Sequence, residues 1–334
     1  MNVECRFFSI SELESNPVYQ AMDFENILST GLDLYKTSII QNPYYQKNNP
    51  VVCLAITDNR IVGRFMILYT RLRLGADIFL VRTGGGIVVS EKYRGMGIGL
   101  SLIQTVLKSE FYFGALYTRA AYNIVRKTET MLEIPQYVRY TYHGFKKLLN
   151  IPILIKTYLL KRRTYIERLS KVPDWVNQMI KSEQSKYMED HDANWLQWAL
   201  DNNAIANVDD YQSFYAVYNK IGKPIGFFMT KTRTIVHDGY SHKKVNLVEW
   251  ASSDTAILDE ADINILAFST LDSSIEKFWT ISNSAKTGSK LKRYFFNRKG
   301  WFAISVKSDE RFVDIGKKDL WRIRYGCGNT TLVD

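Results

Sequence analysis

The stretch that decides the fold is residues 86–106, which read GIVVSEKYRGMGIGLSLIQTV. An apolar run ends at Val89, and after a short loop the residues from Ile98 onward place their apolar side chains on one helical face. The loop and the start of the helix carry glycines at 95, 97 and 99, which let a backbone approach a bulky anion closely. The first turn of a helix leaves N–H groups unpaired and carries positive partial charge. Strand, glycine loop and helix start together predict a cradle for a pyrophosphate group.

The spacing of these glycines excludes two common nucleotide sites. A phosphate-loop NTPase needs GxxxxGK[ST], and that string does not occur in the sequence. A dinucleotide fingerprint needs GxGxxG, whereas the glycines here follow GxGxG. A tight strand-to-helix turn without a ligand is the alternative interpretation of the segment.

The same segment resembles the GNAT superfamily of N-acetyltransferases, whose signature is Arg or Gln, two residues, Gly, one residue, then Gly or Ala. Arg94, Gly97 and Gly99 match this signature. The resemblance implies that the loop and helix start bind the pyrophosphate of coenzyme A through Arg94, Gly95, Met96, Gly97, Ile98, Gly99 and Leu100. It also implies that the preceding strand bulges, separates from its neighbour and pairs with the pantetheine arm through Ile87, Val88 and Val89. The Gly84–Gly86 run is consistent with such a bulge.

The resemblance is less complete at the reacting end of the coenzyme. Asn123 stands where family members often contact the pantetheine, although an ordinary helix cap explains it nearly as well. Many members carry a Tyr seven residues later that protonates the leaving thiolate, but this chain has Thr130 there. Tyr122 and Tyr137 are the nearby candidates for the acid. Glu91 is the candidate base, with an exposed loop charge as the alternative.

The two halves of the chain share an order of predicted elements: helix, hairpin, strand, helix, strand. The hairpins fall at 50–70 and 214–230. This order predicts an α/β (α+β) fold of two GNAT-like units, each a mixed, mostly antiparallel sheet flanked by helices. We expect an acyl-CoA-binding GNAT-like domain at 1–150, a linker or crossing segment at 151–171 and a degenerate GNAT-like domain at 172–334.

The second half lacks the glycine loop. After its predicted central strand the chain reads Ala-Ser-Ser-Asp at 251–254, where side chains obstruct close backbone approach and Asp254 would repel pyrophosphate. We therefore expect this half to bind no coenzyme. Its tryptophans, among them Trp195, Trp198 and Trp250, are predicted to lie in the core.

Two local predictions concern the end of the first half. Residues 123–132 suit a helix, and residues 137–145 suit a strand. The most apolar stretch of the chain, 151–160, is interrupted by Lys156 and is too short to span a bilayer. It is predicted to be a buried strand, a helix or a linker.

Composition limits the remaining functions. The formal net charge of +10 suits a nucleic-acid surface, a pocket for a small polyanion or a solvated basic surface. No zinc-finger spacing or aromatic RNA-binding signature occurs, which disfavours nucleic acid as a partner. The three cysteines form no CxxC pair, so reduced thiols in a cytoplasm are expected. His237 and His242 could hold a metal, but a polar loop is favoured and no metal is expected.

These observations lead to a function expected from the resemblance. It is an acyl-CoA-dependent N-acyltransferase that uses acetyl-CoA or another acyl-CoA as co-substrate and no metal. The amine of a small molecule or peptide attacks the thioester directly. The alternative is a non-catalytic acyl-CoA-binding regulatory or scaffold protein. No membrane partner is expected, and the oligomeric state is left open.

Overall fold

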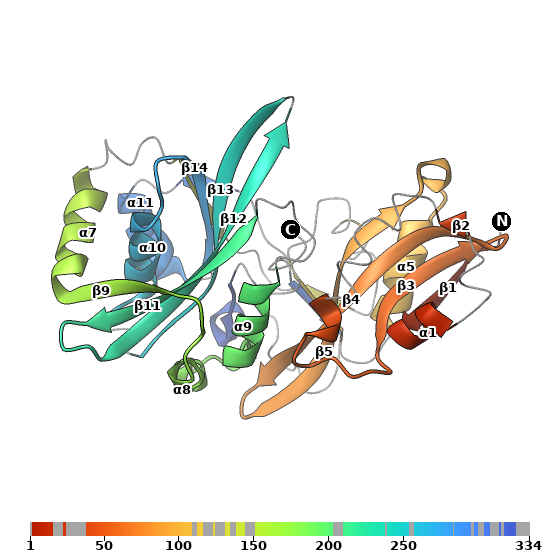
Figure 1. The fold of residues 1–334 in the computed structure, drawn as a ribbon, viewed down its shortest axis with the longest axis horizontal. Helices are drawn as coiled ribbons and strands as arrows, with labels where there is room; N and C mark the ends of the chain where they lie inside the picture. Colours follow the sequence, from red (N-terminus) through yellow and green to blue (C-terminus); the bar gives the residue numbers. More distant parts are fainter. Residues whose placement is uncertain are drawn as a thin grey trace.

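A computed structural model describes residues 2–15, 23–24, 38–108, 112–115, 123, 131–133, 138–143, 151–202, 210–237, 239–253, 257–282, 284–294, 297–299, 304–307, 314 and 317–324. In these ranges the chain forms two β-sheets, each flanked by helices (Figure 1). Both sheets are mixed and mostly antiparallel, which confirms the predicted fold class.

The first sheet has the order β1-β3-β4-β5-β6-β16-β7, with β2 and β10 paired to β4, and β17 paired to β10. Its strands are β1 (Glu4–Ser9), β2 (Asp23–Phe24), β3 (Pro50–Thr57), β4 (Arg60–Leu74), β5 (Asp77–Val89), β6 (Tyr112–Ala115), β7 (Met131–Glu133), β10 (Tyr187–Glu189), β16 (Ile304–Lys307) and β17 (Trp321–Arg322). The hairpin of β3 and β4 confirms the one predicted at 50–70.

The second sheet has the order β15-β8-β14-β13-β12-β11-β9. Its strands are β8 (Val138–His143), β9 (Thr164–Leu169), β11 (Tyr211–Asn219), β12 (Pro224–His237), β13 (Tyr240–Ser252), β14 (Ile275–Ser282) and β15 (Asn297–Lys299). The hairpin of β11 and β12 confirms the one predicted at 214–230, and β13 and β14 run parallel.

Each sheet contains at least one strand from the other half of the sequence. β8, which precedes residue 150, lies between β14 and β15 of the second sheet. β16, close to the C-terminus, lies between β6 and β7 of the first sheet. The domain boundaries near residues 150 and 171 stay a prediction. Strands cross these boundaries in both directions, because β8 joins the second sheet and β16 joins the first.

The described helices are α1 (Ile10–Ser15), α5 (Ile98–Leu107), α7 (Ile151–Arg163), α8 (Trp175–Ser182), α9 (Ala193–Asp201), α10 (Glu260–Ser269) and α11 (Ala285–Arg293), with 3-10 turns η1 (Glu91–Tyr93) and η4 (Lys318–Leu320). None of them is long and apolar enough to cross a bilayer. The helix predicted over 123–132 is wrong at its end, because Leu132 lies in β7 opposite Val306 of β16. A strand from far along the chain thus overrides the local helical pattern.

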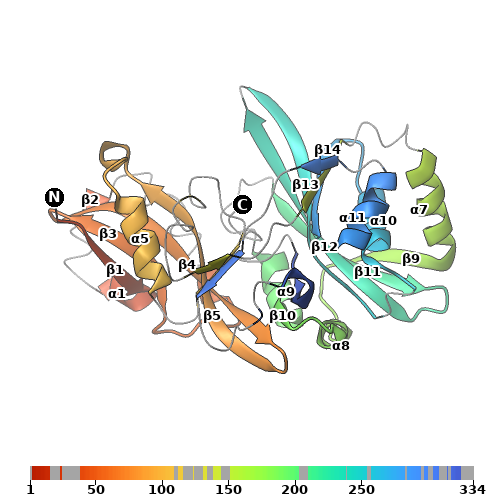
Figure 2. The same cartoon turned by 180° about the vertical axis from the view of Figure 1, so that it is seen from behind.

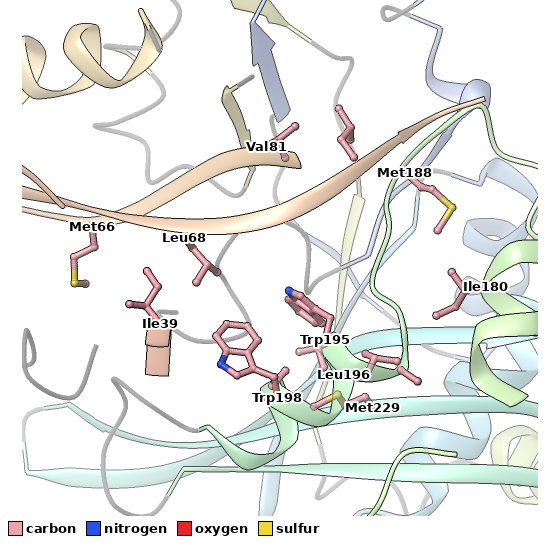
Figure 3. Packing of buried hydrophobic residues seen from close by; sticks show 14 of the residues in the cluster. Ile39, Met66, Leu68, Val81, Ile180, Met188, Trp195, Leu196, Trp198 and Met229 are labelled. Carbon is pink, nitrogen blue, oxygen red and sulfur yellow. The ribbon is translucent and has the colours of Figure 1, made fainter. Parts of the chain in front are cut away.

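Helix α9 joins the two sheets through a shared core. Trp195 and Trp198 are buried and extend from α9 toward Leu68 and Ile39 of the first half, while Met229 of β12 closes the cluster from the second (Figure 3). The Trp198 indole N–H donates to the carbonyl of Ser38 at 2.7 Å. Burial of these tryptophans and of Trp250 confirms their predicted place in the core.

Candidate functional site

The glycine run in β5 forms a β-bulge. Two residues, Gly86 and Ile87, lie opposite the single residue Phe65 of β4, and Gly86 has a φ of 62°. Gly84 lies so close to Phe65 that a Cβ there would be 1.8 Å from a ring carbon, so no larger residue fits without movement of the ring. The irregularity predicted from the three consecutive glycines is therefore present.

In the described residues, β5 pairs with its parallel neighbour β6 only before this bulge. It pairs with β6 only at Arg82 and Thr83, and the described residues include no strand beside the remaining edge of β5. Successive residues of a strand direct their amides to opposite edges. One of Val88 and Val89 therefore directs its N–H away from β4, toward the edge beside which the described residues include no strand, here called the open edge.

The turn after β5 presents backbone amides at the start of α5. Gly95 and the N-cap residue Gly97 have φ of 82° and 81°, and a Cβ on either would meet no atom within 4 Å. The first intrahelical hydrogen bond runs from the Ser101 N–H to the Gly97 carbonyl at 3.0 Å, so the amides of Ile98 to Leu100 precede it. The first turn carries no acidic residue. The open, positively polarised helix start fits a pyrophosphate group.

Two charged side chains border this turn. Arg94 Nη1 lies 3.3 Å from Glu91 Oε1, and its Nε donates to the Val89 carbonyl at 3.3 Å. Glu91 is 81% exposed, in keeping with a loop charge paired to Arg94. Met96 and Leu100 are also exposed, at 58% and 37%.

The described part of the chain does not show the candidates for the acid, the base and the pantetheine contact lying together. Tyr122 and Tyr137 lie outside the described ranges, and Asn123 is exposed. Their roles, and that of Glu91, stay predictions.

The central strand of the second sheet ends in the same way as β5. The Ser90 N–H donates to the Val62 carbonyl at 2.9 Å after β5, and the Ser253 N–H donates to the Ile225 carbonyl at 3.0 Å after β13. β13 also pairs with its parallel neighbour only as far as Asn246. These matching contacts align the end of β13 at Ser253 with the end of β5 at Ser90.

The next described helix after β13, α10, begins with carboxylates instead of glycines. Asp259 is the N-cap of α10 and accepts from the Asp262 N–H at 2.9 Å. The same carboxylate pairs with Lys290, and Asp262 pairs with Lys156 at 2.8 Å. The positive helix start is thus already neutralised by the protein's own anions.

A buried ionic cluster occupies the corresponding edge of β13. Glu249, next to the bulge of that strand, accepts from Arg322 at 2.8 Å and lies 2.7 Å from His191 Nδ1. His191 Nε2 lies 3.1 Å from Glu189, and the imidazole stacks on Trp195 at 3.6 Å. This cluster could not be identified from the sequence, because its members are far apart in the chain.

The charges in this cluster stabilise one another. Burial alone would lower the pKa of His191, but Glu189 and Glu249 raise it to about 9. Burial alone would raise the pKa of Glu249, but Arg322 and His191 lower it to about 2. At neutral pH both groups are therefore charged in the folded chain.

We expect stability to fall as the pH rises. A raised histidine pKa contributes stability that is complete below the ordinary value of 6.5 and is lost as the pH passes about 9. Glu249 acts oppositely: its contribution is present above 4.5 and is lost as the pH falls toward about 2. Urea unfolding at a series of pH values should show a loss of at least about 1 kcal/mol from pH 6.5 to 9, which a His191→Gln variant should lack. A flat wild-type profile would contradict the charged His191.

No protein-family model matches the sequence, and no sequence among curated proteins matches it. Solved structures do match its fold. A GCN5-related N-acetyltransferase from Anabaena variabilis matches with a TM-score of 0.58 and 14% identity, covering 91% of this chain and 72% of that one. Saccharomyces cerevisiae N-myristoyltransferase with bound myristoyl-CoA matches with a TM-score of 0.56 and 10% identity, covering 91% and 82%. A probable N-acyltransferase from Enterococcus faecalis matches with a TM-score of 0.55 and 12% identity, covering 94% and 75%. The chain therefore has the fold of GCN5-related N-acetyltransferases.

Proposed function

We propose that the chain is an acyl-CoA-dependent N-acyltransferase whose coenzyme binds the first unit. The observation that carries this proposal is the open edge of β5 next to the start of α5. That helix has a glycine N-cap and no acidic residue in its first turn. An extended pantetheine arm can pair with that edge while the pyrophosphate accepts from the amides of Ile98 to Leu100. The fold shared with an acetyltransferase and a myristoyltransferase supports an acyl-CoA as the ligand, and acetyl-CoA is one candidate.

The chemistry requires little from side chains. The neutral amine of the acceptor attacks the thioester carbonyl, the carbon–sulfur bond breaks, and coenzyme A leaves as a thiolate that takes up a proton. The N–H of Val88 or Val89 that faces the open edge can stabilise the oxyanion of the tetrahedral intermediate. Tyr122 or Tyr137 is proposed as the acid and Glu91 as the base, directly or through water. Small-molecule amines, such as amino sugars or amino acids, and peptide amines are the acceptor candidates.

The experiment is a turnover assay. The protein is incubated with acetyl-CoA and a panel of amines, and free coenzyme thiol is followed over time. Amine-dependent thiol release that a Gly97→Glu variant lacks would support the enzyme. Binding of acyl-CoA without amine-dependent release would instead support the alternative, a regulatory or scaffold protein without turnover.

We also propose that the protein is cytoplasmic, because reduced thiols such as buried Cys53 persist in that compartment.

We further propose that the second unit is a degenerate copy, so that one coenzyme binds per chain. The Asp259 carboxylate already occupies the start of α10, where it accepts from the Asp262 N–H, and Arg322 donates to the carbonyl of Trp250 beyond the paired part of β13. A pyrophosphate there would face repulsion, and a pantetheine arm would compete with Arg322. Calorimetric titration with acetyl-CoA should give a stoichiometry of one. Two coenzymes per chain, or one retained in a Gly97→Glu variant, would overturn this assignment.

A further inference from the structure

Helix α7 exposes an apolar face. It rests on α10 through buried Ile153 and Leu160 and through the ion pair of Lys156 with Asp262 at 2.8 Å. Its opposite face is solvent-exposed, with 65% of Ile151 and 61% of Tyr158 accessible. The exposed side chains follow the helical spacing of a single stripe: Ile151, Leu154, Ile155, Tyr158 and Leu159. Of the predicted alternatives for residues 151–160, which were a buried strand, a helix or a linker, the structure shows the helix, and its outer face is exposed.

Such a stripe departs from the pattern of ordinary surface helices. A surface helix places polar residues on the side opposite its buried face, whereas α7 is apolar on both sides. Single exposed apolar residues are common, but a contiguous apolar face marks a contact surface. The outer face of α7 therefore requires a partner of its own.

The β11–β12 turn extends this face. The register places Asn219, at the start of the turn, opposite Thr164, the residue that follows α7. Figures 1 and 2 both show this turn next to the C-terminal end of α7 at the outer edge of the second sheet. Ile221 at the tip of the turn is 87% exposed, and Lys220 and Lys223 beside it are exposed too.

The charges on this surface are positive. α7 ends in three exposed basic residues, Lys161, Arg162 and Arg163, close to the two lysines of the turn. Glu167 of β9 is an acidic residue exposed further along that strand, and Asp262 is engaged by Lys156 on the inner side. We call the exposed stripe of α7, its basic end and residues 220–223 the α7 surface.

We propose that the α7 surface binds the headgroup region of an anionic phospholipid bilayer. An apolar helix face bordered by Lys and Arg lies in a membrane interface, with its apolar side chains among the acyl chains and its cations at the lipid phosphates. Nucleic acid would leave the apolar stripe without a partner, and a second copy would bring two positive surfaces together. The expectation of no membrane partner rested on the absence of a spanning segment, which peripheral binding does not need. This inference is independent of the proposed function.

Vesicle co-sedimentation tests the proposal. The full chain should sediment with vesicles of phosphatidylcholine and phosphatidylglycerol, and less with phosphatidylcholine alone. Ile155→Glu should weaken binding at least about tenfold, because it places a charge in the apolar stripe. Arg162→Glu combined with Arg163→Glu should abolish the preference for anionic lipid. Val236→Glu is the matched control, since Val236 is 66% exposed at the end of the β12–β13 hairpin.

The outcomes separate this proposal from its alternatives and from the coenzyme site. All variants should retain cooperative unfolding and the acetyl-CoA affinity of the wild type, because the substituted side chains are exposed and lie outside β5 and α5. Equal sedimentation of the wild type and Ile155→Glu would overturn the proposal. So would a dimer in sedimentation velocity that Ile155→Glu dissociates, since the surface would then be an interface between copies. Loss of vesicle binding leaves the acyltransferase assignment intact, and failure of coenzyme binding leaves the membrane assignment intact.

Discussion

A Gly97→Glu variant is expected to fold and to bind acetyl-CoA at least about a hundredfold more weakly than the wild type. Gly97 is the N-cap of α5 with a φ of 81°, and its open side faces no described atom within 4 Å. A side chain there costs roughly 1–2 kcal/mol of backbone strain, which a domain stable by about 5–15 kcal/mol tolerates. The carboxylate, however, stands where the pyrophosphate is proposed to bind and repels it.

Gly75→Glu is the control for this experiment. Gly75 lies in the β4–β5 turn with a φ of 64°, and a Cβ there also meets no atom within 4 Å. It therefore reproduces the strain and the added charge at the opposite end of β5. Calorimetric titration should show unchanged affinity for Gly75→Glu and lost affinity for Gly97→Glu. If Gly97→Glu binds like the wild type while both variants melt alike, the proposed coenzyme site is wrong.

The sequence predicted the part of the fold that local chemistry controls. Three consecutive glycines inside an apolar strand indicate a bulge, and Gly86 forms it with φ of 62°. Glycines before an amphipathic segment indicate a strand-to-helix turn, and α5 begins at Ile98 as expected. Both features depend on φ freedom and helical periodicity within about twenty residues, so a single sequence contains them.

Contacts between residues that are far apart in the chain could not be predicted from the sequence. β8 and β16 are short strands. The alternation of their side chains indicates which face of a sheet each residue lies on, but it does not identify the neighbouring strand. Their exchange between the sheets could therefore not be predicted. The cluster of His191 and Glu249 is a second case. A carboxylate in the strand pattern of β13 reads as exposed until the fold brings His191 and Arg322 to it. The charged pattern MEDH at 188–191 was the signal available in the sequence.

The bulges of β5 and β13 lie at equivalent positions in the two sheets, and this ionic cluster is present only beside the bulge of β13 among the described residues. In β5 the bulge is made by Gly86, which has no side chain of its own to place beside the adjoining edge. In β13 Glu249 lies beside the bulge, and its carboxylate holds Arg322 of β17 against the strand. β17 pairs in turn with β10, which belongs to the first sheet. This ionic cluster therefore links the second sheet to the first through β17 and β10.

Glu249→Leu should accordingly destabilise the chain by about 3–5 kcal/mol, because it leaves Arg322 and His191 buried without their shared anion. Glu249 is 1% exposed, so water cannot replace the lost carboxylate. Urea unfolding followed by tryptophan fluorescence measures the loss, with Glu167→Leu on exposed β9 as a control expected within about 0.5 kcal/mol of the wild type. Combining Glu249→Leu with His191→Leu should cost less than the sum of the single losses, because the second change removes a charge stranded by the first. A loss below about 1 kcal/mol for Glu249→Leu would show that the cluster does not hold the two sheets together.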